Sequence, residues 1–266
     1  MSTSELPFVD IHCHLLPGLD DGARDWDESL AMARLAAADG TAVVIATPHQ
    51  LGNYAHTRSE TIRARTAQMQ QILDEYGVPL RILPGADVRI EPELPSRVCR
   101  GEIVTLADHR RYLLLELPHE IYVPLDRLLA ELASAGLIGI LSHPERNQAI
   151  LAQPGIVERL VDAGCLMQVT AGSLLGAFGP AVQALAERLV MRRLVHFVAT
   201  DGHGVKMRRP LMQRAFQRLV DIAGRETATE LCCANPACVV DNIQLPRERR
   251  RPAAARFGGW LRRKTG

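Results

Sequence analysis

Histidines and carboxylates that can bind a metal ion recur along this chain of 266 residues. The first two are His12 and His14, which flank Cys13. In an extended backbone residues i and i+2 point to the same side, so both imidazoles can face one cation. Taken alone, such a pair is more typical of two hydrogen-bonded structural histidines than of a metal site. The other candidate ligands therefore decide between these two interpretations.

Seven further candidates lie in a glycine-rich turn or directly after apolar runs. Asp21 belongs to the turn PGLDDG, and the residues that follow the apolar runs are His49, Asp87, Glu116, His143, Asp201 and His203. Mixed imidazole and carboxylate ligation suits Mn, Fe or Zn, and bridging carboxylates can hold two or three ions close together. Without a cation, this many polar groups at one place would be crowded and poorly solvated. A metal cluster is the better interpretation.

Two arginines accompany these candidates and indicate the kind of substrate. Arg146 follows His143 by three residues in HPER, and Arg208 follows His203 by five. A guanidinium group beside metal ions can bind an oxyanion through two parallel hydrogen bonds. For Arg208, which neighbours other basic residues, a surface salt bridge is almost as good an interpretation. Metals and arginines together favour hydrolysis of a phosphate ester.

A cysteine nucleophile is disfavoured. None of the six cysteines has an arginine six positions later, so the phosphate-binding loop of cysteine-dependent tyrosine phosphatases is absent from the sequence. A hydroxide activated by the cations would then attack phosphorus. The arginines would stabilise charge on the phosphoryl oxygens, and His49 or His203 could assist the leaving group.

The candidate ligands follow strands that alternate with helical segments. The apolar runs are Phe8 to Ile11, Ala42 to Ala46, Leu80 to Leu83, Tyr112 to Leu117, Ile138 to Leu141, Leu166 to Val169 and His196 to Ala199. This alternation predicts parallel strands, in an open doubly wound sheet or in a barrel. The strand ends converge on one mouth only in a barrel. We therefore predict an α/β fold, a distorted (β/α) barrel of about seven strands that resembles a TIM barrel.

The bulk properties suit one domain, residues 1–245, followed by a basic tail at 246–266. A net charge of +1 gives no general attraction to nucleic acid. No apolar run approaches the length of a membrane span and the start lacks a secretion signal, so a cytoplasmic location is expected. The tail could make weak contact with anionic lipid at the inner face of the membrane. A solvated, disordered end explains its composition equally well.

The ordered motifs FVDIHCHLLPGLDDGA, ATPH, PGADVRI, LELP, LSHPERN and ATDGHG resemble the polymerase-and-histidinol-phosphatase (PHP) superfamily. Within it, they are most similar to bacterial capsular polysaccharide tyrosine phosphatases of the CpsB and YwqE type. The resemblance covers about Phe8 to Val240. It implies a distorted (β/α) barrel, a trinuclear Mn-type centre, and hydrolysis of phosphotyrosine on a bacterial tyrosine kinase that controls capsular or exopolysaccharide synthesis.

Carried over by motif, the resemblance implies ligands for three metals. The first metal would take His12, His14, Glu116 and Asp201, the second Glu116, Asp87 and His143, and the third Asp21, His49 and His203. Asp87 stands where the family usually has Glu, so we expect the backbone there to lie closer to the metals. The alternatives are another PHP phosphoesterase, such as a histidinol-phosphate phosphatase or a nuclease, and a non-catalytic metal-binding module that docks on the kinase.

Several polar residues are left outside the predicted site. We expect His56, His109, His119 and His196 to be ordinary surface or capping histidines, because they lie off the strand-end pattern or at a strand start. Thr170 and Ser173 follow the sixth run, where they could bind substrate or merely form a turn.

Overall fold

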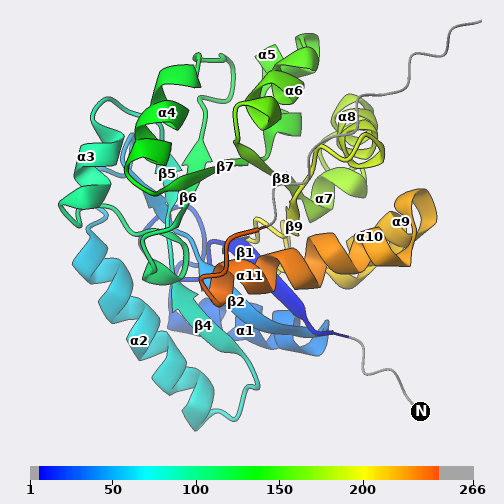
Figure 1. The fold of residues 1–266 in the computed structure, drawn as a ribbon. Helices are drawn as coiled ribbons and strands as arrows, with labels where there is room; N and C mark the ends of the chain where they lie inside the picture. The colour runs from blue at the N-terminus through cyan, green and yellow to red at the C-terminus, as the bar shows by residue number, and fades with distance from the viewer. Residues whose placement is uncertain (1–5, 246–266) are drawn as a thin grey trace, which may run out of the picture.

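The computed structural model describes residues 6–245 (Figure 1), so the predicted basic tail lies outside the described residues. Each of the seven apolar runs lies in a strand, give or take one residue at its ends. Two short strands, β3 and β5, were not predicted. The strands are β1 (Phe8–Cys13), β2 (Thr41–Ala46), β3 (His49–Gln50), β4 (Arg81–Pro84), β5 (Asp87–Arg89), β6 (Tyr112–Glu116), β7 (Ile138–Ser142), β8 (Leu166–Thr170) and β9 (Phe197–Ala199).

Helices occupy most of the segments between the strands and lie outside the sheets (Figure 1). Helix α1 begins after Asp25, whose carboxylate accepts a hydrogen bond from the Glu28 N–H at 2.8 Å. The helices are α1 (Trp26–Ala38), α2 (Ser59–Glu75), α3 (Leu94–Cys99), α4 (Asp126–Ser134), α5 (Gln148–Ala152), α6 (Gly155–Asp162), α7 (Ala171–Leu174), α8 (Pro180–Met191), α9 (Gln213–Ala223), α10 (Arg225–Thr229) and α11 (Asn235–Val240). Three tighter or wider turns are η1 (Leu106–Asp108), η2 (Pro144–Arg146) and the π-helical η3 (Glu230–Ala234).

All strand pairs are parallel, as predicted, but they form two sheets rather than one closed ring among residues 6–245. The first sheet has the order β1-β2-β4 and the second the order β3-β5-β6-β7-β8-β9. Along the chain, β2 is followed by β3 and β4 by β5 after two residues. Pro48 lies in the first of these breaks and has no N–H to donate, which interrupts the hydrogen-bond ladder. The predicted mixed α/β fold is confirmed, while the part of the chain that the structure describes shows no single closed barrel.

The two sheets meet again where the ends of β1 and β9 lie side by side. The His14 N–H donates to the carbonyl of Gly202 at 2.8 Å, and the Asp201 N–H donates to the carbonyl of His12 at 2.7 Å. These bonds join the first strand to the residues that follow the last one. They bring ligand candidates from the two ends of the sequence to the same place.

The amino-terminal ends of the strands are closed by apolar packing and by the end of the described chain. Helix α11 packs beside β1 (Figure 1), and its Val239 is fully buried with Ile11 and Tyr112. The Tyr112 hydroxyl donates to the Ile243 carbonyl at 2.7 Å and accepts from the Leu245 N–H at 3.0 Å. This end is sealed, so the chemistry lies at the opposite, carboxyl ends of the strands.

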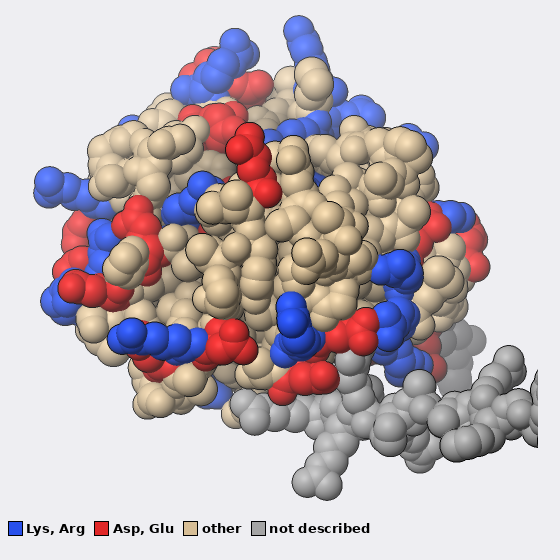
Figure 2. Space-filling view, turned by 90° about the horizontal axis from the view of Figure 1, so that it is seen from above, with Lys and Arg blue, Asp and Glu red and all other residues tan. Residues whose placement is uncertain are grey.

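The described surface carries mixed charge. Figure 2 shows one face on which Lys and Arg alternate with Asp and Glu around the edge, while the middle is made of other residues. On this face the charges thus lie as neighbouring opposite charges rather than gathered into a basic field. None of the helices within residues 6–245 is long and apolar enough to cross a membrane.

Candidate metal centre

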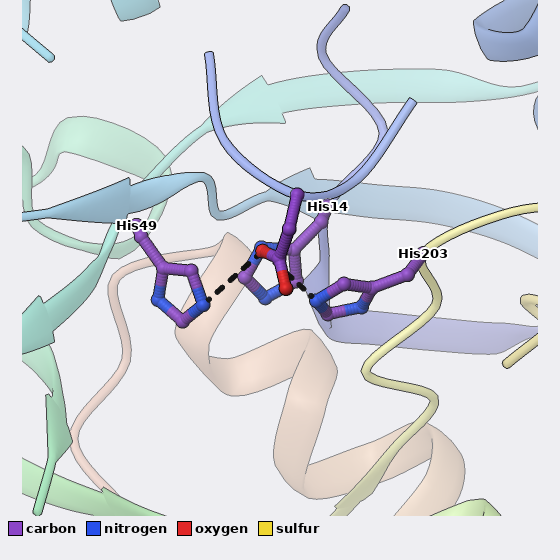
Figure 3. A group of neighbouring side chains, drawn as sticks. His14, His49 and His203 are labelled. Carbon is purple, nitrogen blue, oxygen red and sulfur yellow. Dashed lines mark ion pairs between the residues drawn. The ribbon is translucent and has the colours of Figure 1, made fainter. Parts of the chain in front are cut away.

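Seven of the nine predicted ligands lie at the carboxyl ends of strands or in the loops beyond them, and the other two lie where β2 and β4 continue, after two residues, into the short strands β3 and β5. His12 lies within β1 and His14 directly after it, and Asp21 lies in the loop that follows. His49 begins β3 and Asp87 begins β5, while the remaining four, Glu116, His143, Asp201 and His203, lie at or beyond the ends of β6, β7 and β9. Figure 3 shows His14, His49 and His203 with their rings turned toward one another.

The innermost group is formed by His12, His14, Asp87 and Asp201. The Nε2 atoms of His12 and His14 are 3.1 Å apart, and Asp201 Oδ1 is 3.4 Å from each of them. Asp87 Oδ2 is 3.5 Å from His12 Nε2. Two atoms that each bind one ion at about 2.1 Å are separated by about 3.0–3.5 Å, depending on the geometry. The spacing of these donors therefore fits a shared cation.

The protonation of the imidazoles supports the same interpretation. His12 Nδ1 faces the Gln168 side-chain oxygen at 2.9 Å, and His14 Nδ1 faces Asp20 Oδ2 at 2.6 Å. Since both partners are acceptors, each Nδ1 carries a hydrogen, and each ring in its neutral form has a lone pair on Nε2. Two neutral rings would direct these lone pairs at each other across 3.1 Å. Either a proton or a metal cation must therefore lie between them, and a metal cation binds both lone pairs at once.

A second group gathers around His49 and His203. Asp21 Oδ1 lies 3.5 Å from Nε2 of His49 and 3.5 Å from Nε2 of His203. The His203 Nδ1 atom is 2.9 Å from the Asp201 carbonyl, so its Nε2 also carries the lone pair, and this atom has no hydrogen-bond partner among the described residues. Together with His14, these residues can hold an ion.

A third group consists of His49, Asp87 and Glu116. His49 Nδ1 is 3.5 Å from Asp87 Oδ2 and 3.7 Å from Glu116 Oε2. Asp87 is fully buried, and within residues 6–245 neither of its carboxylate oxygens has a hydrogen-bond partner. A buried carboxylate without such partners is costly unless a cation neutralises it. Asp87 is thus the strongest single indication of a metal.

Without a metal ion, several ionisable groups of this site have pKa values far from their usual ones. Burial, reinforced by the Asp87 charge, raises the pKa of Glu116 to about 7. Burial opposes protonation of His14, but Asp20 and Asp201 overcome it and raise the pKa of that imidazole to about 10. Burial and the neighbouring His14 lower the pKa of His49 to about 4. Cations here would favour ionised carboxylates and neutral imidazoles, which are the forms that bind metals.

The grouping differs in detail from the one that the resemblance implies. Asp87 rather than Glu116 joins His12 and His14, and His49 rather than His143 joins Asp87 and Glu116. His143 Nε2 lies 4.0 Å from Asp87 Oδ2, at the edge of the third group. Asp87 belongs to two of these groups, and its carboxylate can bridge two cations because it has two oxygens.

Both predicted arginines reach the same carboxylate. Arg146 and Arg208 donate to Asp201 Oδ2, and the Arg146 guanidinium carbon lies 4.3 Å from the centre of the Phe178 ring. Arg208 therefore points into the site, where its ion pair is with the buried Asp201 rather than with a carboxylate on the surface. Both line a cavity of about 230 Å³ beside the candidate ligands, whose other walls are Asp21, His49, Glu116, Leu117, His119, Ser142, His143, Pro144, Asn147 and Asp201.

Three residues of this site have an unusual backbone. The φ angles are 33° at His143, 51° at Asp201 and 47° at Arg208, in the left-handed region that non-glycine residues rarely adopt. His143 directly follows the last residue of β7, and Asp201 is the second residue after the end of β9. These turns direct ligand and guanidinium side chains back over the strand ends.

The chain can now be placed among known proteins. Residues 8–241 match the family described as capsular polysaccharide synthesis, CpsB/CapC. The chain belongs to this family. It is 36% identical over 239 residues to the tyrosine-protein phosphatase YwqE of Bacillus subtilis (strain 168), covering 89% of this chain and 90% of YwqE. It is 29% identical over 238 residues to the tyrosine-protein phosphatase CpsB of Streptococcus pneumoniae, covering 87% of this chain and 98% of CpsB.

The structural comparison agrees with the family assignment. A crystal structure from work on YwqE of Bacillus subtilis and CpsB of Streptococcus pneumoniae, described as unique metal-dependent tyrosine phosphatases, aligns with a TM-score of 0.86 at 35% identity. It covers 90% of this chain and 96% of that one. A prolidase aligns with a TM-score of 0.51 at 12% identity, which shows a shared fold alone.

Some functional residues of this CpsB/CapC family member were missed in the sequence. Asp20 orients His14 and also accepts from the His49 N–H at 2.8 Å, yet it stands beside Asp21 in DDG and no pattern separates the two. Gln168 orients His12 from within β8, where it looks like any polar strand residue. His119 lines the cavity, although we expected it to lie outside the site.

The Ser173 hydroxyl and the Thr170 backbone have structural partners, whereas the Thr170 hydroxyl has no hydrogen-bond partner within residues 6–245. Ser173 donates to Glu145 Oε1 at 2.7 Å, and the Thr170 N–H donates to the same oxygen at 2.9 Å. Glu145 is fully buried and immediately precedes Arg146. Thr170 and Ser173 therefore anchor the η2 turn that carries the arginine, which favours the structural interpretation of Ser173.

Proposed function

We propose that this chain is a metal-dependent protein-tyrosine phosphatase that hydrolyses phosphotyrosine on a bacterial tyrosine kinase controlling capsular or exopolysaccharide synthesis. The observation that carries the proposal is the meeting of metal-type donors with two guanidinium groups at one cavity. The donors fit cations, and the arginines fit the phosphoryl oxygens of a substrate. The similarity to YwqE and CpsB supports phosphotyrosine as the substrate class.

For the metal we propose Mn²⁺, in two or three ions, with Fe or Zn as cations that suit the same donors. The ligands would be His12, His14, Asp21, His49, Asp87, Glu116, His143, Asp201 and His203. When bound, the ions supply Lewis-acid charge for the phosphoryl group and lower the pKa of water, so that hydroxide is available near neutral pH.

The residues of the chain bind and orient the substrate. Arg146 and Arg208 direct their donors at the phosphoryl oxygens, and Asp201 holds both guanidinium groups beside the cavity. Gln168 and Asp20 fix the imidazoles of His12 and His14, so the ligands need little rearrangement. We also assign His49 and His203 a role in assisting departure of the tyrosyl oxygen.

We further propose that the two sheets are one distorted barrel of about seven strands, in which β2 with β3 and β4 with β5 each count as one interrupted strand. The backbone bonds between the ends of β1 and β9 support this proposal. Residues 1–245 would form this single domain. The basic tail at 246–266 would then make weak contact with the inner face of the membrane, which would place a cytoplasmic enzyme near a membrane-bound kinase.

The test compares three substrates on the full chain: a phosphotyrosine peptide from a bacterial kinase tail, histidinol phosphate and single-stranded DNA. We expect the peptide to be hydrolysed fastest, EDTA to abolish turnover, Mn²⁺ to restore it, and thiol alkylation to leave most of it. Faster turnover of histidinol phosphate or DNA would identify another phosphoesterase of the superfamily. Binding of the peptide without turnover in the metal-loaded protein would indicate a docking module.

A further inference from the structure

Three of the five imidazoles in the centre are oriented by a hydrogen bond at Nδ1. The acceptors are the Gln168 side chain for His12, Asp20 for His14 and the Asp201 carbonyl for His203. His49 lacks such a bond among the described residues, because both of its ring nitrogens face candidate ligands: Nε2 faces Asp21 and Nδ1 faces Asp87, each at 3.5 Å. Within residues 6–245 no hydrogen bond to a ring nitrogen therefore orients the plane of this ring.

An aromatic ring lies against His49. The ring centres of His49 and Tyr54 are 5.1 Å apart and the ring planes differ by 17°, so the two rings are stacked. The His14 ring contacts His49 as well, at 4.6 Å and 58°. Two neighbouring rings at different angles leave the His49 imidazole little freedom to rotate.

The loop that carries Tyr54 is itself fixed. The Tyr54 N–H donates to the Leu51 carbonyl, and the Thr57 N–H donates to the Tyr54 carbonyl, both at 2.9 Å. At the start of the loop the Gly52 N–H donates to Glu91 Oε1 at 2.9 Å, and at its end the Thr57 hydroxyl donates to the Leu19 carbonyl at 3.1 Å. The last of these bonds joins it to the loop that bears Asp21. Four hydrogen bonds thus hold the loop that presents Tyr54.

We propose that Tyr54 is a positioning residue that holds the His49 ring in the plane in which both nitrogens face carboxylates. It thereby preorganises the ion site formed by His14, Asp21, His49 and His203 without touching the ion. The inference rests on the proposed function only for its activity readout, because metal binding is measured without substrate.

The test uses Tyr54→Phe, Tyr54→Leu and Tyr54→Ala in the full chain, with Tyr76→Leu as the matched control. Tyr76 is 61% exposed and lies at the end of α2. Mn²⁺ is titrated into chelator-treated protein by calorimetry, and kcat and KM for 4-nitrophenyl phosphate are measured at low and saturating Mn²⁺. Thermal unfolding of each variant checks that it is folded.

An aromatic pair contributes enough to change an affinity about 3- to 10-fold, so we expect Tyr54→Leu and Tyr54→Ala to weaken one class of Mn²⁺ site by about that factor. Tyr54→Phe should retain most of the affinity, Tyr76→Leu should match the wild type, and saturating Mn²⁺ should restore kcat with KM unchanged. Wild-type Mn²⁺ affinity in Tyr54→Leu, or an increased KM at unchanged affinity, would overturn the proposal in favour of a substrate-contacting role.

The two proposals fail separately. A wild type that binds Mn²⁺ but does not hydrolyse phosphate esters would refute the phosphatase and leave the affinity comparison intact. A wild type that binds no Mn²⁺ would refute the positioning role of Tyr54 as well.

Discussion

Replacing Asp20 by Asn tests whether orientation of the ligands, rather than their presence alone, sets metal affinity. The Asp20 side chain is fully buried and accepts three hydrogen bonds: from His14 Nδ1 at 2.6 Å, from the His49 N–H at 2.8 Å and from the Gly22 N–H at 2.9 Å. The first two reach Oδ2 and the third reaches Oδ1. Asparagine has the same shape, but it offers one acceptor oxygen and one donor nitrogen.

The size of the effect follows from this pattern. The amide is expected to keep its oxygen at the Oδ2 position, where two donors meet, and to turn its NH₂ group against the Gly22 N–H. One buried N–H then loses its acceptor, which costs about 1–3 kcal/mol of unfolding free energy. The bond to His14 also loses its charge. Substitution of such a ligand-orienting residue typically weakens metal binding about 10- to 100-fold, equivalent to about 1.4–2.7 kcal/mol.

Two measurements check this prediction. Calorimetric titration of Mn²⁺ into chelator-treated Asp20→Asn should show the weaker binding, and phosphatase activity should recover as Mn²⁺ is raised. The control is Asp27→Asn, which removes one charge from the exposed first turn of α1 and should bind metal normally. An Asp20→Asn protein with wild-type metal affinity would refute the view that Asp20 orients His14 for ligation.

Three further substitutions test other parts of the site. Arg146→Lys removes the planar donor fork and its stacking on Phe178, so kcat/KM should fall by at least about tenfold while Mn²⁺ content stays normal; an unchanged kcat/KM would contradict the assignment. Asp87→Glu adds a methylene to a fully buried side chain whose carboxylate already lies 3.5 Å from two imidazoles. The value of kcat should therefore fall through crowding. Tighter metal binding with a higher kcat would show that the site has room for the longer side chain. Gly22→Ala places a Cβ atom onto the carbonyl oxygen and Cβ of His14, so thermal unfolding should shift to a clearly lower temperature; a wild-type transition would show that the turn can move.

The sequence predicts the part of the site that follows from strand geometry. Runs of Val and Ile mark the buried parallel strands, and in parallel strands the residue after each run lies at the same edge. This is why residues as distant as His12 and Asp201 could be placed together. The division into two sheets was not predicted, because it depends on breaks such as the one at Pro48, after which β3 is only two residues long.

The supporting contacts could not be predicted, because they depend on loop conformation rather than on periodicity. Asp20 and Asp21 are adjacent and chemically identical, yet one side chain is buried against His14 while the other is 53% exposed beside His203. Likewise, nothing in the letters LGNYAH places the ring of Tyr54 on His49, since that contact requires the turn between Leu51 and Tyr54. The lipid-binding tail, the ligand assignments and the identity of the metal stay predictions.

The left-handed backbone at His143, Asp201 and Arg208 lowers the stability of the folded protein, but it places three side chains of the site. Each such residue costs about 1 kcal/mol or more relative to a relaxed conformation, a sizeable share of the net stability of about 5–15 kcal/mol that a domain possesses. Glycine at these positions would relax the backbone and remove the functional side chain at the same time. Selection for thermostability alone would therefore favour substitutions that remove these functional side chains. Stabilising substitutions that spare the site are better placed at the amino-terminal ends of the strands, around Tyr112.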